Sequence, residues 1–172
     1  MPKNWTRFDD PNKEQLLSWF QSEQAGGLQF DLLHPVAQHA LLVFQDQLTD
    51  PFPRIESHGN YVFGMLACPT SVEDDRADFY TIHFFANFDQ IVTVMRSSAM
   101  SKFDTKNQVI DTVRKKIEEI VTLFDHTDWS VGMAITRLAD VVVTQLEQSL
   151  KLLKENVVVD LELVTSESRQ IP

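Results

Sequence analysis

Apolar and polar residues alternate with a period of two in the middle of the chain, which predicts a sheet built from hairpins. The first predicted hairpin, residues 54–67, joins a charged strand to an almost wholly apolar one through His58-Gly59-Asn60. The second, residues 78–96, turns at residues 87–90. Residues 69–77 between them are polar and predict a solvated connection. Apolar side chains on both strand faces predict a sheet covered on both sides, with buried Phe63, Phe79, Phe84 and Phe85.

The N-terminal part of the chain carries two segments with helical spacing. Residues 10–27 predict a short helix, with Asp10 as the N-cap and two glycines at its end. Residues 34–50 predict a second helix with apolar positions on one face. Between them, residues 28–33 alternate weakly and predict a strand, so the expected order is helix, strand, helix.

Beyond residue 101 the pattern is helical throughout. Apolar positions recur at spacings of three and four in residues 104–125 and again in residues 128–161. No proline interrupts the second segment, so the predicted helix is on the order of 50 Å long. Because a small sheet cannot cover such a helix, we expect part of it to need another partner.

These patterns predict an α+β fold of the α/β/α sandwich type. A mixed, largely hairpin-built sheet is covered by helices on both faces, and the C-terminal third is helical. We expect a single domain over residues 1–172, with a sheet-rich core at residues 28–100 and a helical part at 101–172. A chain of 172 residues with 43% hydrophobic and 23% charged residues suits one compact domain.

Charge and composition exclude several classes of protein. The 25 acidic residues outnumber the 15 Lys and Arg, and the net charge of −10 disfavours nucleic acid and anionic membranes as partners. The single Cys68 cannot form an internal disulfide or a cysteine-rich zinc module, which fits a reducing compartment. No run approaches the roughly 18 apolar residues of a membrane span, so we expect this chain alone to be soluble.

The sequence shows no catalytic motif, and we expect no enzymatic activity. There is no glycine-rich phosphate loop, no GxSxG and no HExxH. His34 precedes Pro35 and is interpreted as a turn residue between a strand and a helix, and His83 as a packed, hydrogen-bonded core residue. Along the chain the five histidines lack close ligand spacing: His34, His39, His58, His83 and His126. A further set of acids is interpreted as helix caps and solvated faces: Asp104, Asp111, Asp125 and Asp128.

The order of the segments carries a family resemblance. "DLLHP" precedes a predicted helix, and "PRIESHGNYVFGML" and "FYTIHFFANFDQIVTVMRS" follow it. This succession resembles the cytoplasmic N-terminal domain of the CorA family of divalent cation transporters, with its HP helix, RPK(I/V)E strand, acidic or Asn-Tyr turn and long apolar strand. "MAITRLADVVVTQLEQSLKLLKE" is similar to the LLDxxVDxY helix of that family. The resemblance covers roughly residues 28–165.

The resemblance implies a regulatory role at the cytoplasmic face of the cell membrane. In the family, this domain belongs to a homopentamer whose long stalk helix leads into the membrane domain. Carboxylates of adjacent subunits bind Mg²⁺, and their repulsion when Mg²⁺ falls favours the open pore. The Gly-Met-Asn pore signature and both membrane helices of the family are absent from this sequence.

The family's metal-binding acids transfer only in part. Where the family often has an acidic pair early in the helix after HP, this chain has Gln38 and His39. Asp140 matches the first acid of LLDxxVDxY, whereas Thr144 stands at the second. Mg²⁺ is the implied ion, with Zn²⁺ and Co²⁺ second to it, and His39 keeps the zinc-transporting branch of the family open. The candidate metal ligands are Asp140, Asp46, Asp50 and Glu147.

Two other classes of function compete with the regulatory domain. A protein-interaction module that uses the long helix predicts a stable partner for the isolated chain. A small soluble enzyme predicts a pocket with converging polar groups.

Overall fold

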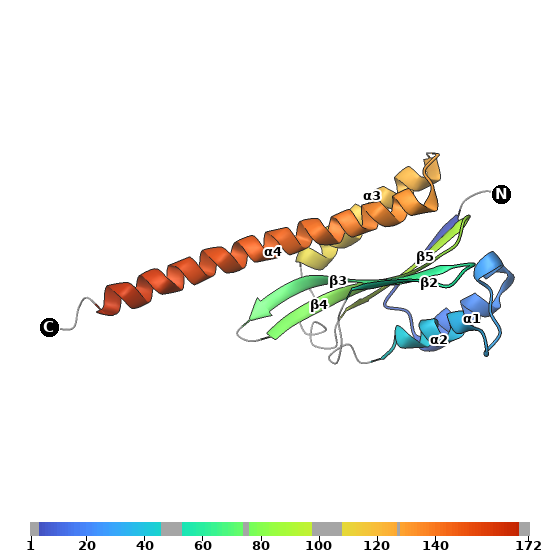
Figure 1. The fold of residues 1–172 in the computed structure, drawn as a ribbon, viewed down its shortest axis with the longest axis horizontal. Helices are drawn as coiled ribbons and strands as arrows, with labels where there is room; N and C mark the ends of the chain where they lie inside the picture. Colours follow the sequence, from blue (N-terminus) through green and yellow to red (C-terminus); the bar gives the residue numbers. More distant parts are fainter. Residues whose placement is uncertain (1–3, 46–52, 74–75, 98–107, 127, 169–172) are drawn as a thin grey trace.

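The computed structural model describes residues 4–45, 53–73, 76–97, 108–126 and 128–168. Figure 1 shows a central sheet with helices on either side of it. In chain order the elements, of which η1 is a 3₁₀ helix, are β1 (Asn4–Asp9), α1 (Lys13–Gln21), η1 (Glu23–Leu28), α2 (Pro35–Leu42), β2 (Arg54–Ser57), β3 (Val62–Glu73), β4 (Arg76–Ala86), β5 (Gln90–Ser97), α3 (Gln108–His126) and α4 (Val131–Ser168).

The sheet has five strands in the order β1-β5-β4-β3-β2. Strands β2 to β5 are joined as successive antiparallel hairpins, whereas β1 lies parallel to β5 with Trp5 opposite Ile91. The turn from β4 to β5 is closed by a hydrogen bond from the Asn87 amide to the Gln90 carbonyl. The predicted mixed, hairpin-built sheet is therefore confirmed.

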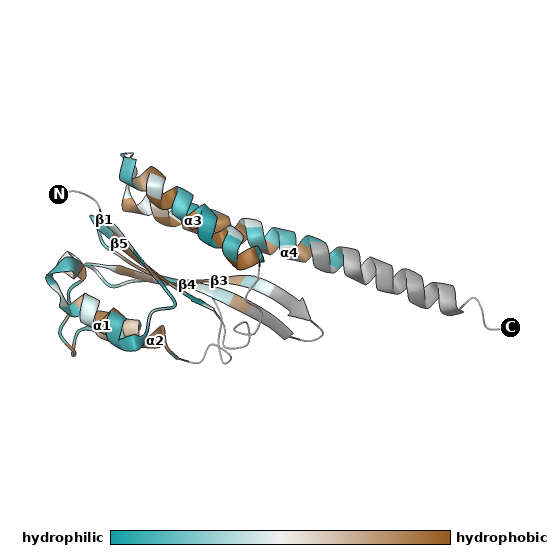
Figure 2. Ribbon diagram, turned by 180° about the vertical axis from the view of Figure 1, so that it is seen from behind, coloured by the Kyte–Doolittle hydropathy of each residue, from teal (hydrophilic) through white to brown (hydrophobic). Residues whose placement is uncertain are grey.

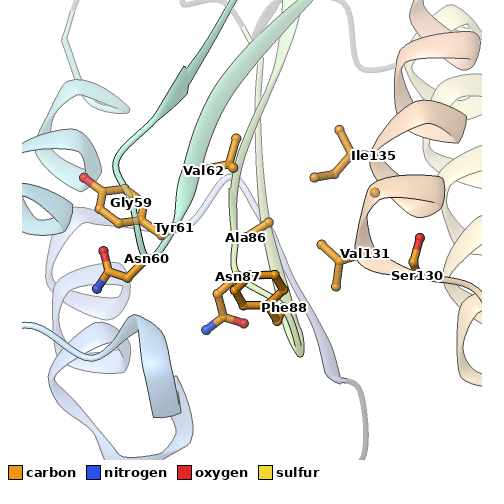
Figure 3. Close-up of a pocket in the computed structure, with 11 residues that line it drawn as sticks. Gly59, Asn60, Tyr61, Val62, Ala86, Asn87, Phe88, Ser130, Val131 and Ile135 are labelled. Atoms are coloured by element: carbon orange, nitrogen blue, oxygen red, sulfur yellow. The ribbon is translucent and has the colours of Figure 1, made fainter.

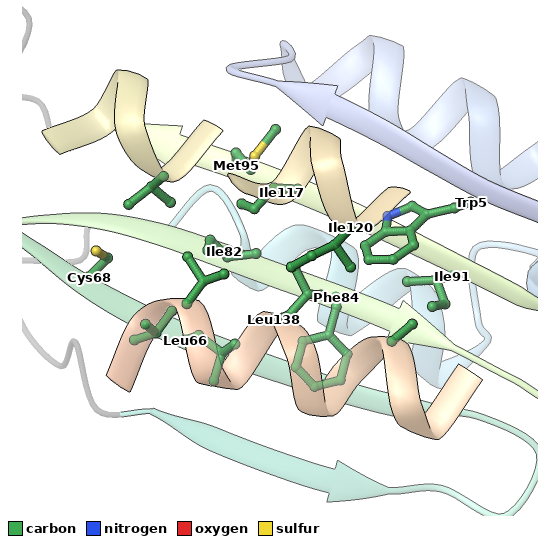
Figure 4. Close-up of a cluster of buried hydrophobic side chains, with 14 of the residues drawn as sticks. Trp5, Leu66, Cys68, Ile82, Phe84, Ile91, Met95, Ile117, Ile120 and Leu138 are labelled. Atoms are coloured by element: carbon green, nitrogen blue, oxygen red, sulfur yellow. The ribbon is translucent and has the colours of Figure 1, made fainter. Parts of the chain in front are cut away.

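Helices cover both faces of the sheet, because apolar side chains point to both sides of its central strands. On β4, Ile82 and Phe84 join the core under α3 and α4 (Figure 4), whereas Phe85 joins the core under α1 and α2. Phe63, Phe84 and Phe85 are fully buried as expected, and Phe79 is only half-buried. The α/β/α sandwich predicted from the sequence is confirmed.

The amphipathic pattern of α3 accounts for its place on the sheet. Its buried residues recur every three or four positions, so one face of the helix packs against the sheet while the other is polar (Figure 2). Trp5 of β1 lies edge-on to Phe124 of α3 with ring centroids 5.5 Å apart, and its indole N–H donates to Thr93 Oγ1 at 3.1 Å. These contacts fix the edge strand β1 beneath the helix.

Helix α4 is the long element that the sequence predicts. It has 38 residues, about 57 Å at the usual rise, and Figure 1 shows it running past the end of the sheet. Ala134 and Leu138 are fully buried, while Val143 and Leu150 are 52% and 64% exposed. None of the helices in the described ranges is both long enough and apolar enough to span a membrane.

The N-terminal region differs from the sequence prediction in its strands. Residues 4–9 form β1, which was not predicted, and residues 28–33 are not a strand. Leu28 ends η1 as a buried residue, and Asp31 Oδ1 then accepts a hydrogen bond from the Leu33 amide at 3.1 Å. This local side-chain bond favours a turn over a strand. Exposed Leu32 and Leu33 produced the misleading apolar pattern.

The N-cap of α1 differs from the predicted residue, whereas His34 lies directly before α2 as predicted. Asp10 has φ +44° and is not the N-cap of α1; Asn12 is, through a capping box with Gln15. His34 is the N-cap of α2, and its Nδ1 accepts from the Val36 amide at 3.2 Å, in line with its predicted role before that helix. The predicted helix over residues 34–50 ends at Leu42, and its last five positions lie outside the described residues.

Residues 69–77 were predicted as a solvated connection, and this was wrong. Strand β3 continues to Glu73 and β4 begins at Arg76, with Ser71 opposite Asp78. The register shifts between Pro69 and Ser71, where proline lacks the N–H that a regular ladder uses.

Candidate functional site

The described candidate acids lie apart on α4 and face solvent. Asp140 is exposed, and its Oδ2 lies 3.4 Å from Arg137 Nη1. The Thr144 hydroxyl donates to the Asp140 backbone carbonyl at 2.8 Å and not to its carboxylate. Glu147 is exposed two helical turns further on, at an axial distance of about 10 Å. Asp46 and Asp50 lie outside the described residues.

A different group of potential metal ligands lies together at the β2–β3 turn: His39, Glu56 and His58. His39 comes from α2, Glu56 from β2, and His58 follows directly after β2. Glu56 Oε2 lies 3.1 Å from His58 Nε2 and 3.4 Å from His39 Nε2. One ligand atom of each residue lies within 4.8 Å of the other two, the only such group of three or more acidic, His or Cys residues among the described positions.

The local backbone explains how Glu56 and His58 come to the same side. Residues two apart in an extended chain point to one face, and α2 packs against that face with His39. The His58 amide donates to the Tyr61 carbonyl at 2.9 Å and closes the hairpin. Gly59 has φ +80°, a conformation that L side chains adopt only with strain, so the tight turn after His58 needs glycine.

Aromatic neighbours hold both imidazole rings in place. The His39 ring stacks on Phe63, with centroids 4.5 Å apart and planes within 5°. The His58 ring stacks on Tyr61, with centroids 4.9 Å apart. His39 Nδ1 also shares a 2.9 Å hydrogen bond with Tyr61 Oη. The rings are thus fixed from the far side, and Nε2 of each points to Glu56.

The electrostatics of the turn favour a neutral His39. Burial lowers its pKa, and His58 and Arg54 lower it further against the opposing effect of Glu56. Burial and the Glu56 carboxylate raise the pKa of Tyr61, so its hydroxyl stays protonated. The side chain of His39 is 12% exposed, whereas those of His58 and Glu56 are 30% and 37% exposed. The group is therefore open to solvent on one side.

Little in the amino-acid pattern indicates this cluster. His39 and His58 were judged to lack ligand spacing because they are far apart along the chain. The one available signal was the Glu56-Ser57-His58 triplet at a predicted strand end, where alternation places the first and third side chains on one face. His39 joins them only through the packing of α2 on the sheet.

A largely apolar pocket of about 270 Å³ lies beside the same turn. Figure 3 shows it between the β2–β3 turn, the β4–β5 turn and the first turns of α4. Among the residues that line the pocket, Tyr61 has a titratable side chain. The residues that line it are Gly59, Asn60, Tyr61, Val62, Ala86, Asn87, Phe88, Ser130, Val131, Gly132 and Ile135.

His83 is buried elsewhere in the sheet. It is 2% exposed, and neither ring nitrogen has a hydrogen-bond partner among the described residues. The prediction of a packed residue is confirmed, while the predicted hydrogen bond is not found within that part of the chain. Burial, together with the positive charges of Arg96 and Arg54, lowers its pKa to about 3.

The fold of this chain is similar to that of a solved structure. The chain is similar to the soluble domain of CorA from Methanocaldococcus jannaschii, with a TM-score of 0.51 and 14% sequence identity. The similarity covers 95% of this chain and 54% of that one, so this chain spans about half the length of the matched structure. Neither a known family profile nor a curated protein sequence matches the chain. At this identity the similarity concerns the fold.

Proposed function

We propose that this chain is a cytosolic regulatory domain of a CorA-like divalent cation transporter. The observation that carries the proposal is the similarity of its fold to the CorA soluble domain over 95% of the chain. The proposed location is the cytoplasmic face of the cell membrane, and the proposed partners are further copies of the chain in a homopentamer and a membrane domain of the same protein.

The length of α4 supports this proposal. Its buried stripe includes Leu138, Val142 and Gln145, and the apolar Val143, Leu146 and Leu150 are exposed. A helix that runs past its own sheet with exposed apolar side chains gains stability from a neighbouring subunit or from a continuing stalk. Under the proposal, α4 transmits movement of the domain toward the pore.

We propose that Mg²⁺ regulates the transporter from subunit interfaces. Asp140 and Glu147 are too far apart along one helix to share an ion in a single chain, so the ligand set needs acids of a neighbouring copy. A formal charge of −10 on each chain makes close packing of copies unfavourable unless a cation compensates it. Metal that binds the closed packing more tightly than the open one then closes the pore as cytosolic Mg²⁺ rises.

A second candidate is the cytosolic domain of a zinc-transporting relative in the same family. The convergence of His39, Glu56 and His58 favours it, because imidazole nitrogens suit Zn²⁺ and not Mg²⁺. In both candidates the chain is a binding domain without enzymatic activity.

The test is ion uptake by the natural protein that contains this chain. Expressed in bacteria that lack their own Mg²⁺ uptake, it should fractionate with membranes and restore uptake that falls as cytosolic Mg²⁺ rises. Uptake of Zn²⁺ in place of Mg²⁺ would favour the second candidate. Recovery from the soluble fraction alone, bound to an unrelated partner and without ion uptake, would contradict both and support an interaction module.

A further inference from the structure

We propose that His39, Glu56 and His58 form a binding site for one divalent transition metal ion, Zn²⁺ first, within a single chain. The ligand atoms are Nε2 of each histidine and Oε2 of Glu56. This site is separate from any acidic site on α4 and uses no residue of a second copy.

The two separations from Glu56 Oε2 to the histidines are close to those around tetrahedral zinc. Zn²⁺ binds nitrogen and oxygen at about 2.0–2.2 Å, which places two ligand atoms of a tetrahedron about 3.3–3.6 Å apart. Glu56 Oε2 lies 3.4 Å from His39 Nε2 and 3.1 Å from His58 Nε2. One ligand atom of each residue lies within 4.8 Å of the other two, so small side-chain rotations bring the three residues to a shared ion.

The groups behind the three ligands are those that a metal site requires. With Nδ1–H of His39 donating to Tyr61 Oη, the Nε2 lone pair is left free to bind metal. Arg54 Nε lies 3.5 Å from Glu56 Oε1, so the second carboxylate oxygen is paired while Oε2 faces the histidines. Stacking on Phe63 and Tyr61 limits rotation of both imidazoles. Little side-chain ordering remains to be done when the ion binds.

The donor set selects the class of ion. Two imidazoles and one carboxylate suit Zn²⁺ and its neighbours in the first transition row, whereas Mg²⁺ prefers six oxygen ligands and holds its water. Glu56 is 37% exposed on its side chain, so the fourth position is open to water. The single carboxylate also compensates half of the charge of the ion.

Binding would join two layers of the fold. His39 lies on α2, whereas Glu56 and His58 belong to the edge strand β2 and its turn. The ion would fix this turn against the helix, and Gly59, Asn60 and Tyr61 of the same turn line the apolar pocket. Zinc therefore sets the shape of one pocket wall.

Zinc competition against a chromophoric chelator tests the site in the full 172-residue chain. We expect one Zn²⁺ per chain, and a loss of at least about 100-fold in affinity in His39→Gln, His58→Gln and Glu56→Gln. Tyr61→Phe should lose about 10-fold, the effect of a missing support behind a ligand. The matched control is His126→Gln, because His126 is exposed at the end of α3 and should leave the affinity unchanged.

Side-chain ¹⁵N spectra of the wild-type chain give a readout that needs no variant. Zn²⁺ should shift Nε2 of His39 and His58 and leave the other histidines in place, and millimolar Mg²⁺ should not reverse the shift. Unshifted histidines, or ligand variants that fold and bind zinc like the wild type, would overturn the proposal. Since the site lies within one chain, its failure would leave Mg²⁺-regulated uptake by the natural protein standing, and the converse also holds.

Discussion

The ring of Phe84 lies over Gly64 on the neighbouring strand, in the space that a Cβ at position 64 would occupy. The two residues are paired across β3 and β4, and both are buried at the centre of the sheet. Phe84 faces the layer of α3 and α4, where it packs in one cluster with Ile82 and Leu138 (Figure 4). Glycine at this position leaves the room that the Phe84 ring occupies beneath the helices.

This pair predicts the effect of substitutions on stability. Gly64→Ala should lower the free energy of unfolding by about 1–3 kcal/mol, because the methyl group displaces the ring. Phe84→Ala should lower it by about 3–5 kcal/mol, because it leaves a cavity. Urea denaturation measures both. Gly132→Ala is the control, since its new methyl group meets only Ser130 Oγ at an ordinary 3.8 Å, and a loss at position 64 no larger than at 132 would refute the packing.

His83 predicts a specific loss of stability in acid. An unfolded chain binds the proton of this imidazole with a pKa of 6.5, whereas burial and the charges of Arg96 and Arg54 lower the folded-state pKa to about 3. Between these values the unfolded state binds more protons, so the folded state loses stability as pH falls. The full effect is on the order of 5 kcal/mol.

Denaturation of His83→Met between pH 7 and pH 3 should isolate this contribution. The variant should lose less stability than the wild type below about pH 6.5, because it has no imidazole to protonate. His126→Gln serves as the control, since it removes an exposed histidine at the end of α3. Parallel pH profiles for wild type and His83→Met would show that the buried imidazole is not responsible.

Strong local patterns made most of the layers predictable. The alternation in β4 and β5 and the helical stripe of α3 each bury the residues that the sequence indicates. The edge strand β1 was missed because its six residues bury little beyond Trp5, which leaves almost no pattern to detect. Residues 28–33 were misassigned because hydrogen bonding of the Asp31 side chain to the Leu33 amide competes with strand formation.

The candidate metal site depends on contacts that no local pattern encodes. Glu56 and His58 share a face through strand geometry, and this much follows from the sequence. His39 reaches them because α2 packs on the sheet beside β2, with its ring on Phe63. The acids chosen from the family pattern do not converge within one chain, because Asp140 and Glu147 are spaced along one exposed helix side.

Millimolar Mg²⁺ should therefore change the melting temperature of the isolated chain very little. A ligand stabilises a protein only if it binds the folded state, and Asp140 and Glu147 offer no shared site within one chain. The check is a thermal melt at micromolar protein with and without Mg²⁺, with Zn²⁺ as the positive control. A rise of several degrees with Mg²⁺ would reveal a self-contained oxygen site and contradict the proposed interface.

Among the described acids, Asp140 matches the family pattern best. Its substitution should change the regulation of uptake by Mg²⁺ without changing ion conduction. In the natural assembly, Asp140→Asn removes one negative ligand and should shift the inhibition of uptake to higher cytosolic Mg²⁺, by about fivefold or more. Uptake at low Mg²⁺ should stay at the wild-type rate, because the ions pass through another part of the protein. Asp125→Asn, an equal change of charge on an exposed position of α3, should behave like the wild type.

The most direct measurement is the rate of uptake as a function of cytosolic Mg²⁺ for the wild-type assembly and these two variants. We expect a wild-type rate that falls as cytosolic Mg²⁺ rises, with the midpoint displaced in Asp140→Asn alone. An unchanged midpoint in Asp140→Asn would remove this residue from the sensor and leave Asp46, Asp50 and Glu147 as the candidates. A wild-type rate that does not depend on cytosolic Mg²⁺ would contradict the regulatory role itself.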